Sequence, residues 1–433
     1  MKAVKHAVFF LLVLVAIPRS ASAGEMPSTL PEEVGLSGPK LQEVKKVVQG
    51  LVDQKEFAGA VTMVARHGKV VQVNALGMMD IEAGKPMRPD TIFRIYSMTK
   101  PVTNVAAMML FEEGKFQLDD PVSKYIPELK GLRVQAPKGS DTVEAKREMT
   151  IRDLMRHTSG LTYGFFGGSA VDKLYLERKV LDPQSDLQAM VTKLGKIPLL
   201  SQPGTRWQYS VSTDVLGRLV EVISGKSLDA FFEEQIFKPL DMKDSGFFVP
   251  EGKVERFSVN YSRGEKGALK ANDVPAKSSY LKRPKLLSGG GGLVSTARDY
   301  TRFCQMLLDG GELQGTRLLK KETIQLMSSN QLPDEAMPLS LPGIKLPTKG
   351  LGFGLGFAVL LEAAGPGSAG TAGEYFWGGA ASTNFYICPK QDLVIVAMTQ
   401  FMPVSPKLGE AFKKGVYESL LDKSAGKKTD AEK

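Results

Sequence analysis

The sequence predicts an α/β protein of the α+β type: one mixed, mainly antiparallel sheet flanked by helices, with an inserted, mostly helical domain. Two observations predict this fold class. β-rich runs occur near the N-terminus and again after residue 290, and the stretch between them is helical or looped. Because strands bury their apolar faces together, the two ends are expected to share one sheet. The sheet domain then comprises residues 24–96 and 290–421, and the inserted domain residues 97–289.

The first 23 residues have the three parts of a secretory signal peptide. Lys2 and Lys5 are positive, residues 7–17 are apolar, and residues 21–23 (Ala-Ser-Ala) are small enough for cleavage. The apolar run is far shorter than the roughly 20 residues that a membrane-spanning helix needs. We expect cleavage after this segment and export to the periplasm or the medium, with no stable membrane insertion of the mature chain.

A helix and a hairpin are predicted next. Apolar residues recur at helical spacing in GPKLQEVKKVVQGLVDQ, which predicts an amphipathic helix with an inner face of Leu41, Val44, Val48, Leu51 and Val52. Two β-rich runs in AGAVTMVARHGKVVQVNALG meet at His67-Gly68, which is typical of a β-hairpin. At that turn His67 is expected to be solvated rather than catalytic.

The middle of the chain is predicted to consist of helices joined by loops. A strand-like run, TIFRIYS, leads into an apolar helical stretch that begins near Lys100 and ends at Gly114. Short helices are predicted at residues 150–156, 212–224 and 228–237. The runs GLRVQAPKGSDTVEAKREM and VNYSRGEKGALKANDVPAKSSYLKRPK are expected to be surface loops.

From Gly289 the chain becomes β-rich again. GGGGLVSTARDYTRFCQMLLDGG predicts a Gly-rich turn followed by a helix. Strands are predicted in GLGFGLGFAVLLE, GEYFWGG, STNFYIC and DLVIVAMTQ. A last helix is predicted at residues 406–421, and residues 422–433 are expected to form a flexible, solvated tail.

Composition argues against several function classes. The formal net charge is +9, and +6 without the signal segment, but no basic block with interleaved aromatics occurs. Nucleic acid binding is therefore not expected. Cys304 lies within a predicted helix and Cys388 ends a predicted strand, so two buried free thiols are favoured over a disulfide. The three His and two Cys are dispersed, so neither a metal nor a cofactor site is predicted.

The segment Ser97-Met98-Thr99-Lys100 is the first candidate for chemistry. A hydroxyl and an amine three residues apart lie on one side of a helix, and a helix N-terminus favours developing negative charge. A lysine can take the serine proton only if it is neutral or shares charge with a neighbour. Four Ser-x-x-Lys matches occur, at Ser37, Ser97, Ser279 and Ser424. Only Ser97 stands at a strand-to-helix junction, where the alternative role is that of a capping serine.

Two further elements complete the pattern. In PGTRWQYSVSTDVLGRLVEVISG, Tyr209 lies just before a predicted helix. A tyrosine there is either a packing residue or a base and proton relay beside Lys100. In YFWGGAAST, Trp377-Gly378-Gly379 lies on a β-rich run, where paired glycines let the backbone approach a substrate. The N–H just beyond them can complete an oxyanion hole with the N–H of Ser97.

These elements, in this order, resemble the serine hydrolases of the class C β-lactamase superfamily, which includes β-lactamases, D,D-peptidases and family VIII carboxylesterases. IFRIYSMTK, MTIRDLMRHTSGLTYG, PGTRWQYSVSTDVLGRLVEVISG, GGGGLVSTARDYTRFCQMLLDGG and WGG look like landmarks of that superfamily, over about residues 30 to 420. The resemblance implies a β-lactamase/penicillin-binding-protein-like fold.

The resemblance also implies roles for individual residues. Ser97 is the acylated nucleophile, and Lys100 and Tyr209 share the base and acid work. The backbone N–H groups of Ser97 and Ala380 hold the oxyanion. Trp377, Gly378 and Gly379 line the substrate site. His157, in HTSGL, is expected to be a buried structural histidine rather than a triad base.

Two departures point to the esterase branch. The usual Tyr-x-Asn motif has Val211 in the Asn place, and the usual Lys-Thr-Gly or His-x-Gly motif is Trp377-Gly378-Gly379. A lactam or peptide substrate loses polar partners by these changes, whereas a neutral ester does not. We therefore expect a carboxylesterase acting on small or short-acyl esters. The alternatives are a β-lactamase or D-amino-acid peptidase, an acyltransferase, and a non-catalytic binding protein with the same fold.

Overall fold

The computed structural model describes residues 24–136, 141–339, 350–365 and 368–421. The expected signal segment and C-terminal tail lie outside these residues. An eight-stranded sheet has the order β12-β13-β14-β15-β16-β1-β2-β3, and all its neighbouring strands are antiparallel. Its strands are β1 (Gly59–Arg66), β2 (Lys69–Asp80), β3 (Lys85–Pro86), β12 (Leu351–Phe353), β13 (Ala358–Leu360), β14 (Tyr375–Gly378), β15 (Asn384–Cys388) and β16 (Leu393–Met398).

The sheet is built from both ends of the chain, as predicted. β1 lies between its hairpin partner β2 and the late strand β16, pairing Val61 with Met398. The hairpin turns at His67 and Gly68, with φ of 52° and 71°, a left-handed pair that suits a two-residue turn. His67 is partly exposed, and its Nδ1 lies 2.7 Å from Oδ2 of Asp392.

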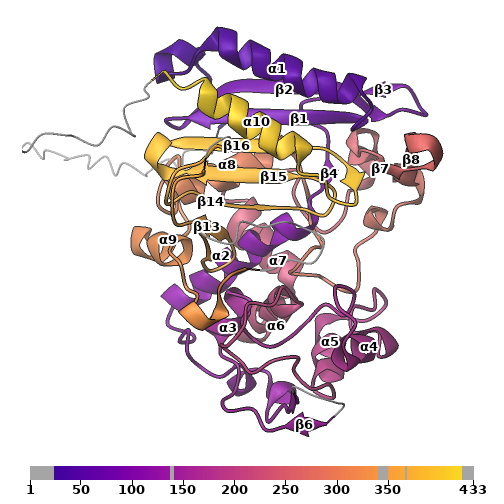
Figure 1. Ribbon diagram of the computed structural model, residues 1–433, viewed down its shortest axis with the longest axis vertical. Helices are drawn as coiled ribbons and strands as arrows, with labels where there is room; N and C mark the ends of the chain where they lie inside the picture. Colours follow the sequence, from indigo (N-terminus) through magenta and orange to yellow (C-terminus); the bar gives the residue numbers. More distant parts are fainter. Residues whose placement is uncertain (1–23, 137–140, 340–349, 366–367, 422–433) are drawn as a thin grey trace, which may run out of the picture.

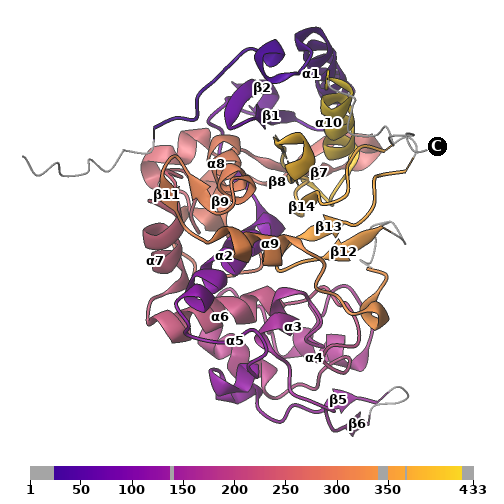
Figure 2. The same cartoon turned by 90° about the vertical axis from the view of Figure 1, so that its left-hand side faces the viewer.

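Helices cover both faces of the sheet (Figures 1 and 2). On one face lie α1 (Gly38–Asp53) and α10 (Lys407–Glu418), which pack on each other and share an apolar cluster with β1 and β16. The other face receives α8 (Ala297–Leu308), which packs on β16, β1 and β15. Because both faces are covered, every residue of β1 is buried. Ser37 caps α1 by accepting a hydrogen bond from the N–H of Lys40.

The helical part lies beyond that second face, in the lower half of Figure 1. At its centre α2 (Thr99–Glu112) packs on α6 (Ser212–Ser224), and α2 is buried on nearly all sides. Around them lie α3 (Ile151–Met155), α4 (Ala170–Glu177), α5 (Leu187–Leu194) and α7 (Leu228–Phe232), which continues as a π-helical turn (Glu233–Phe237). The predicted helices at residues 150–156, 212–224 and 228–237 are thus present.

Both predicted surface loops contain strands, which corrects the sequence analysis. β5 (Val134–Gln135) pairs with β6 (Thr142–Val143). β7 (Asn260–Arg263) and β8 (Leu269–Asp273) form a hairpin that β17 (Phe401–Met402) joins in parallel. These strands are short and lie in runs rich in polar residues and glycine, so their sequence resembles that of a loop, and among their partner strands only β17 is distant in sequence. Helices α4, α5 and α9 (Lys321–Ser328) were not predicted either.

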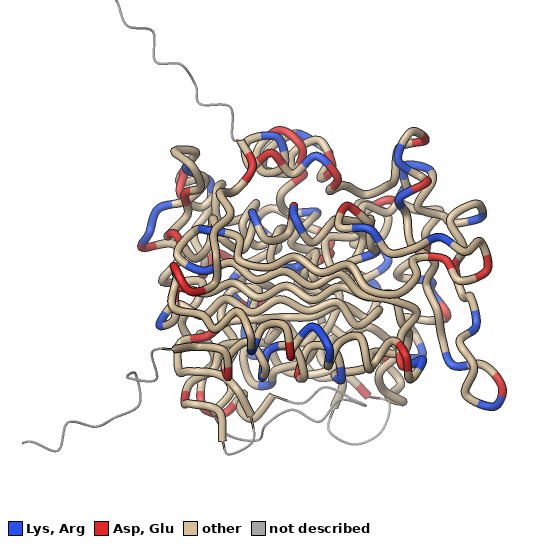
Figure 3. Tube along the Cα trace, turned by 90° about the horizontal axis from the view of Figure 1, so that it is seen from above, with Lys and Arg blue, Asp and Glu red and all other residues tan. Residues whose placement is uncertain are grey.

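Cys304 and Cys388 are free and buried, as favoured from the sequence. Among the described residues, no helix is both long and apolar enough to cross a bilayer. Seen from above, Lys and Arg are interspersed with Asp and Glu around the rim of the described chain, while the sheet between them carries few charges (Figure 3).

Candidate active site

Ser97 lies at the predicted strand-to-helix junction. β4 (Phe93–Arg94) pairs with β9 (Val294–Ser295), a 3₁₀ turn (Tyr96–Met98) follows, and α2 begins at Thr99. Tyr96 has a φ of 41°, a strained value for a non-glycine residue, directly before Ser97.

Arg94 anchors the strand that leads into this turn. Its side chain is fully buried, and its Nε donates to Oδ2 of Asp273 at 2.7 Å. Its guanidinium also donates to the carbonyl of Ser258 and lies 3.9 Å from the centre of the Phe257 ring. A buried charge is tolerated only with such partners. The rigid anchor therefore fixes the backbone that presents Ser97.

Lys100 meets three oxygen atoms inside the protein. Its Nζ lies 3.3 Å from Oγ of Ser97, 2.9 Å from the hydroxyl of Tyr163 and 2.6 Å from the carbonyl oxygen of Gly290. The lysine side chain is 1% exposed. The Ser97–Lys100 pair expected from the sequence is therefore within hydrogen-bonding reach, with the amine buried and Ser97 partly exposed.

Tyr209 lies beside Lys100, but its ring rather than its hydroxyl faces the amine. The Nζ atom is 4.5 Å from the centre of the Tyr209 ring, a cation–π distance. The Tyr209 hydroxyl accepts a hydrogen bond from Nε1 of Trp377 at 3.3 Å. Two predicted site residues, Tyr209 and Trp377, are thus joined directly, although one lies before α6 and the other on β14.

Tyr163 is a site residue that the sequence analysis did not single out. Its hydroxyl accepts from Lys100, and its ring centre lies 5.4 Å from that of Tyr209. Burial raises the pKa of Tyr163 well above its ordinary value, and electrostatic interactions with the neighbouring Tyr209 and Asp214 side chains act in the same direction. The only sequence signal was its place at the end of the landmark run HTSGLTYG.

Asp214 is a second unpredicted polar group at this centre. It is buried in α6, where its Oδ1 accepts from the Ser288 hydroxyl and from the N–H of Gly290. Burial raises the pKa of Asp214, although the Ser288 hydrogen bond and the charge of Lys100 oppose the shift. Its Oδ2 has no hydrogen-bond partner among the described residues.

The glycine run at residues 289–292 fits between these groups. A Cβ on Gly290 would lie 2.6 Å from Oδ2 of Asp214 and 3.0 Å from the Tyr163 hydroxyl. A side chain at this position would collide with both groups, so the close packing around Lys100 requires glycine here. The predicted Gly-rich turn is therefore part of the site.

The strand of the WGG motif passes close to the junction. β14 contains Trp377 and Gly378, and it packs on the turn that contains Ser97. A Cβ on Gly379 would lie 2.4 Å from the carbonyl oxygen of Ile95, so the two backbones touch here. Ala380, the expected second oxyanion donor, follows directly.

His157 is buried against the site. Its ring centre lies 4.9 Å from that of Tyr209, and its Nδ1 is 3.4 Å from Oγ of Ser210. Burial, together with the charge of Lys100, holds the pKa of His157 well below its ordinary value. The imidazole is therefore neutral, and it packs on Tyr209 and hydrogen-bonds to Ser210, in line with the structural role expected for it.

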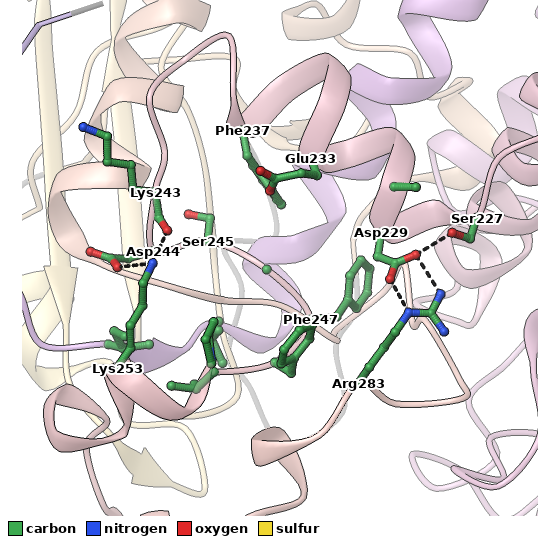
Figure 4. Close-up of a pocket in the computed structure, with 17 residues that line it drawn as sticks. Ser227, Asp229, Glu233, Phe237, Lys243, Asp244, Ser245, Phe247, Lys253 and Arg283 are labelled. Atoms are coloured by element: carbon green, nitrogen blue, oxygen red, sulfur yellow. Dashed lines mark hydrogen bonds and ion pairs between the residues drawn. The ribbon is translucent and has the colours of Figure 1, made fainter.

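A cavity of about 490 Å³ lies elsewhere, between α7 and the loop at residues 243–250 (Figure 4). Asp229 is paired there with Arg283, and Asp244 with Lys253. None of the predicted site residues lines this cavity. The candidate catalytic residues lie around Ser97 instead. Among the described residues, no three His, Cys, Asp or Glu side chains group to hold a metal ion.

The sheet-and-helix fold places the chain in a class of proteins, the serine hydrolases with the β-lactamase fold. The Beta-lactamase family model matches residues 44–414, and the chain belongs to that family. It is 32% identical to esterase EstB of Burkholderia gladioli over 84% of this chain and 92% of that protein.

Two other similarities extend this result. Protein Rv1367c of Mycobacterium tuberculosis is 38% identical over 82% of this chain and 89% of its own length. The solved structure of EstCE1, described as a hydrolase with promiscuous acyltransferase activity, superposes with a TM-score of 0.74 at 26% identity. That superposition covers 87% of this chain and 98% of EstCE1.

Proposed function

We propose that this protein is an exported carboxylesterase that hydrolyses small or short-acyl esters through an acyl-enzyme on Ser97. The observation that carries the proposal is the contact of Lys100 Nζ with Ser97 Oγ at 3.3 Å, inside a site walled by Tyr163 and Tyr209. A nucleophile within hydrogen-bonding reach of a base that other groups orient is the arrangement that covalent catalysis requires.

Acylation begins when Ser97 Oγ attacks the ester carbonyl and gives its proton to the unprotonated member of the Lys100–Tyr209 pair, which is Lys100 when its amine is neutral or the Tyr209 phenolate when Lys100 is charged. The N–H groups of Ser97 and Ala380 are the proposed donors to the oxyanion. The alcohol leaves with the proton from the same lysine–tyrosine group. Water then attacks the acyl carbonyl, and Ser97 recovers its proton.

An ester fits the two sequence departures better than a lactam does. Val211 is fully buried where the family pattern has an amide. Trp377 stands where the family pattern has a cationic residue. Its side chain is uncharged and donates its N–H to Tyr209, so it supplies no positive charge to a substrate carboxylate. EstB is named an esterase, which supports the same reading. β-Lactamase or D-amino-acid peptidase activity is the rival within the family.

Acyl transfer to an alcohol is a second candidate, supported by the activity described for EstCE1. It uses the same acyl-enzyme and differs only in the last nucleophile. Product analysis with an added alcohol separates the two: an esterase yields the acid, and an acyltransferase yields the new ester.

The deciding experiment compares initial rates on p-nitrophenyl butyrate and nitrocefin for the chain from Gly24 onward. Ser97→Ala is the test variant. Ser279→Ala is its matched control, because Ser279 also begins a Ser-x-x-Lys match but is exposed. We expect ester turnover that only Ser97→Ala abolishes, with little nitrocefin turnover. Dominant nitrocefin turnover would favour the β-lactamase, and ester turnover that survives Ser97→Ala would refute the mechanism.

Export is tested separately. Lys2, Lys5 and the apolar run at residues 7–17 support a cleaved signal segment. Expression of the full chain in a bacterium, followed by fractionation and N-terminal sequencing, is expected to yield a protein outside the cytoplasm that begins at Gly24. An uncleaved chain in the cytoplasm would contradict the proposal.

A further inference from the structure

One large aromatic side chain at the site is left uncovered. Phe165 is 58% exposed, although it lies two residues from Tyr163. The Phe165 and Tyr163 rings are stacked, with centres 5.1 Å apart and an interplanar angle of 28°. Tyr163 is also hydrogen-bonded to Lys100, so direct contacts link the exposed Phe165 ring to the candidate catalytic lysine.

Phe165 is the outer end of a continuous aromatic wall. Its ring centre lies 4.6 Å from that of Phe166, which in turn is 6.1 Å from Tyr209. Tyr209 contacts Trp377 at 5.5 Å between ring centres. These rings surround the side of the site on which the lysine lies, and only Phe165 is largely open to solvent.

The loop that carries Phe165 is fastened at both ends. Asp172, on α4, accepts hydrogen bonds from the hydroxyls of Thr162 and Ser169. Gly164 has a φ of 83°, and a Cβ there would lie 2.6 Å from Cβ of Tyr175. The exposed ring is therefore held in place against its neighbours, which suits a preorganised binding surface.

The chemistry of ester cleavage indicates which part of an ester, acyl or alcohol, lies against the aromatic wall that ends at Phe165. In acylation a bond forms between Ser97 Oγ and the carbonyl carbon, and the bond from that carbon to the alcohol oxygen breaks. The departing oxygen must reach the group that took the Ser97 proton, which is the Lys100–Tyr209 pair, and Tyr163 contacts both of these residues. The alcohol part of the ester therefore leaves along the side walled by Tyr163 and Phe165, while the acyl part stays on Ser97.

We propose that Phe165 forms a subsite for the alcohol part of the substrate, and that the protein prefers esters of aromatic or other bulky apolar alcohols. This inference rests on the proposed esterase function. A flat apolar group stacked on Phe165 removes the exposed ring from water and adds an aromatic contact. The acyl group has no such contact with Phe165, so its size is selected elsewhere.

The test compares three esters: ethyl butyrate, benzyl butyrate and ethyl phenylacetate. For Phe165→Ala we expect kcat/KM on benzyl butyrate to fall about tenfold, and on the other two esters to change less than about twofold. Both butyrates form the same butyryl-Ser97, so deacylation is expected to keep one rate in the variant. Phe165→Tyr, which keeps the stacked ring, should retain the benzyl preference.

Leu176→Ala is the matched control, since Leu176 is an apolar residue on nearby α4 with the same 58% exposure. It is expected to leave all three rates unchanged. An equal loss of Phe165→Ala on all three esters, a loss confined to ethyl phenylacetate, or no loss at all would overturn the subsite. Wild-type protein that cleaves no ester and does not react with a fluorophosphonate at Ser97 would instead overturn the proposed function, and the subsite with it.

Discussion

Lys100 and Tyr163, which are 63 positions apart in the chain, are joined by a hydrogen bond of 2.9 Å. The bond makes Tyr163, rather than Tyr209, the phenol that holds the lysine amine. Tyr209 contributes its ring face to the same amine. The two tyrosines therefore have different geometric relations to one lysine, and substitutions can separate them.

Tyr163→Phe removes the hydroxyl and keeps the ring. Lys100 then loses one of its three acceptors and keeps Ser97, the Gly290 carbonyl and the Tyr209 ring face. We expect kcat on p-nitrophenyl butyrate to fall by about 10- to 100-fold, with KM within a few-fold and a shifted pH–rate profile. Tyr125→Phe is the control, because its hydroxyl bonds to Asp120 and the Lys115 carbonyl. An unchanged kcat and profile in Tyr163→Phe would show that the hydroxyl is only structural.

The chain has two tryptophans, and both contact the Tyr209 ring, so they form a matched pair. Trp377 Nε1 donates to the Tyr209 hydroxyl, whereas Trp207 Nε1 has no partner among the described residues. Trp377→Phe is expected to lower kcat about tenfold because Tyr209 loses the donor that orients it. Trp207→Phe removes no such bond and should keep kcat within about twofold. Equal effects in steady-state assays of the two variants would mean that the Trp377 hydrogen bond is irrelevant to catalysis.

The difference between Tyr163 and Tyr209 also shows what the sequence could predict about the site. Ser97 and Lys100 are three residues apart at the start of a helix, so local geometry alone brings them together. Tyr209 stood in a recognisable motif before a helix. Tyr163 and Asp214 have no local pattern of that kind, since their approach to Lys100 depends on how α2 packs on α6 and on the loop before α4.

The fold likewise has parts that local sequence patterns predict and parts that depend on tertiary contacts. The long strands β1, β2 and β16 were predictable because each is a run of β-forming residues that buries its own apolar face. The β7–β8 hairpin was taken for a loop, since its third strand, β17, has two residues and comes from residues 401–402. Pairing of that kind is decided by tertiary contacts, which a local pattern does not record.

Gly290 offers a test of close packing at the site. A Cβ there would lie 2.6 Å from Asp214 Oδ2 and 3.0 Å from the Tyr163 hydroxyl, both buried polar atoms. Gly290→Ala is therefore expected to cost about 1–3 kcal/mol of unfolding free energy and to lower kcat/KM by at least about tenfold. Gly291→Ala is the control, since its nearest atoms would lie 3.9 Å away. Denaturant unfolding and ester assays on both variants check this, and equal behaviour would contradict the packing argument.

Asp299 predicts how stability depends on pH. Burial, aided by the charge of Asp244, raises its pKa to about 6, although a hydrogen bond from the Asp244 N–H opposes the shift. An unfolded aspartate titrates near 3.9. Between about pH 4 and 6 the folded protein therefore binds more protons than the unfolded chain, and this group lowers the unfolding free energy as pH rises, by roughly 3 kcal/mol in all.

Asp299→Asn cannot titrate, so its unfolding free energy relative to wild type should rise by roughly 2–3 kcal/mol from pH 4 to 6.5. Asp241→Asn is the control of opposite sign. Burial opposes ionisation of Asp241, but hydrogen bonds from Lys243 and Arg298 hold its pKa below the ordinary value. The stability that Asp241 contributes is present above the unfolded pKa and is lost in acid. The unfolding free energy of Asp241→Asn should therefore fall furthest below that of wild type at neutral pH. Urea unfolding at several pH values measures both, and two slopes of the same sign would show that the proton of Asp299 is not linked to folding as argued.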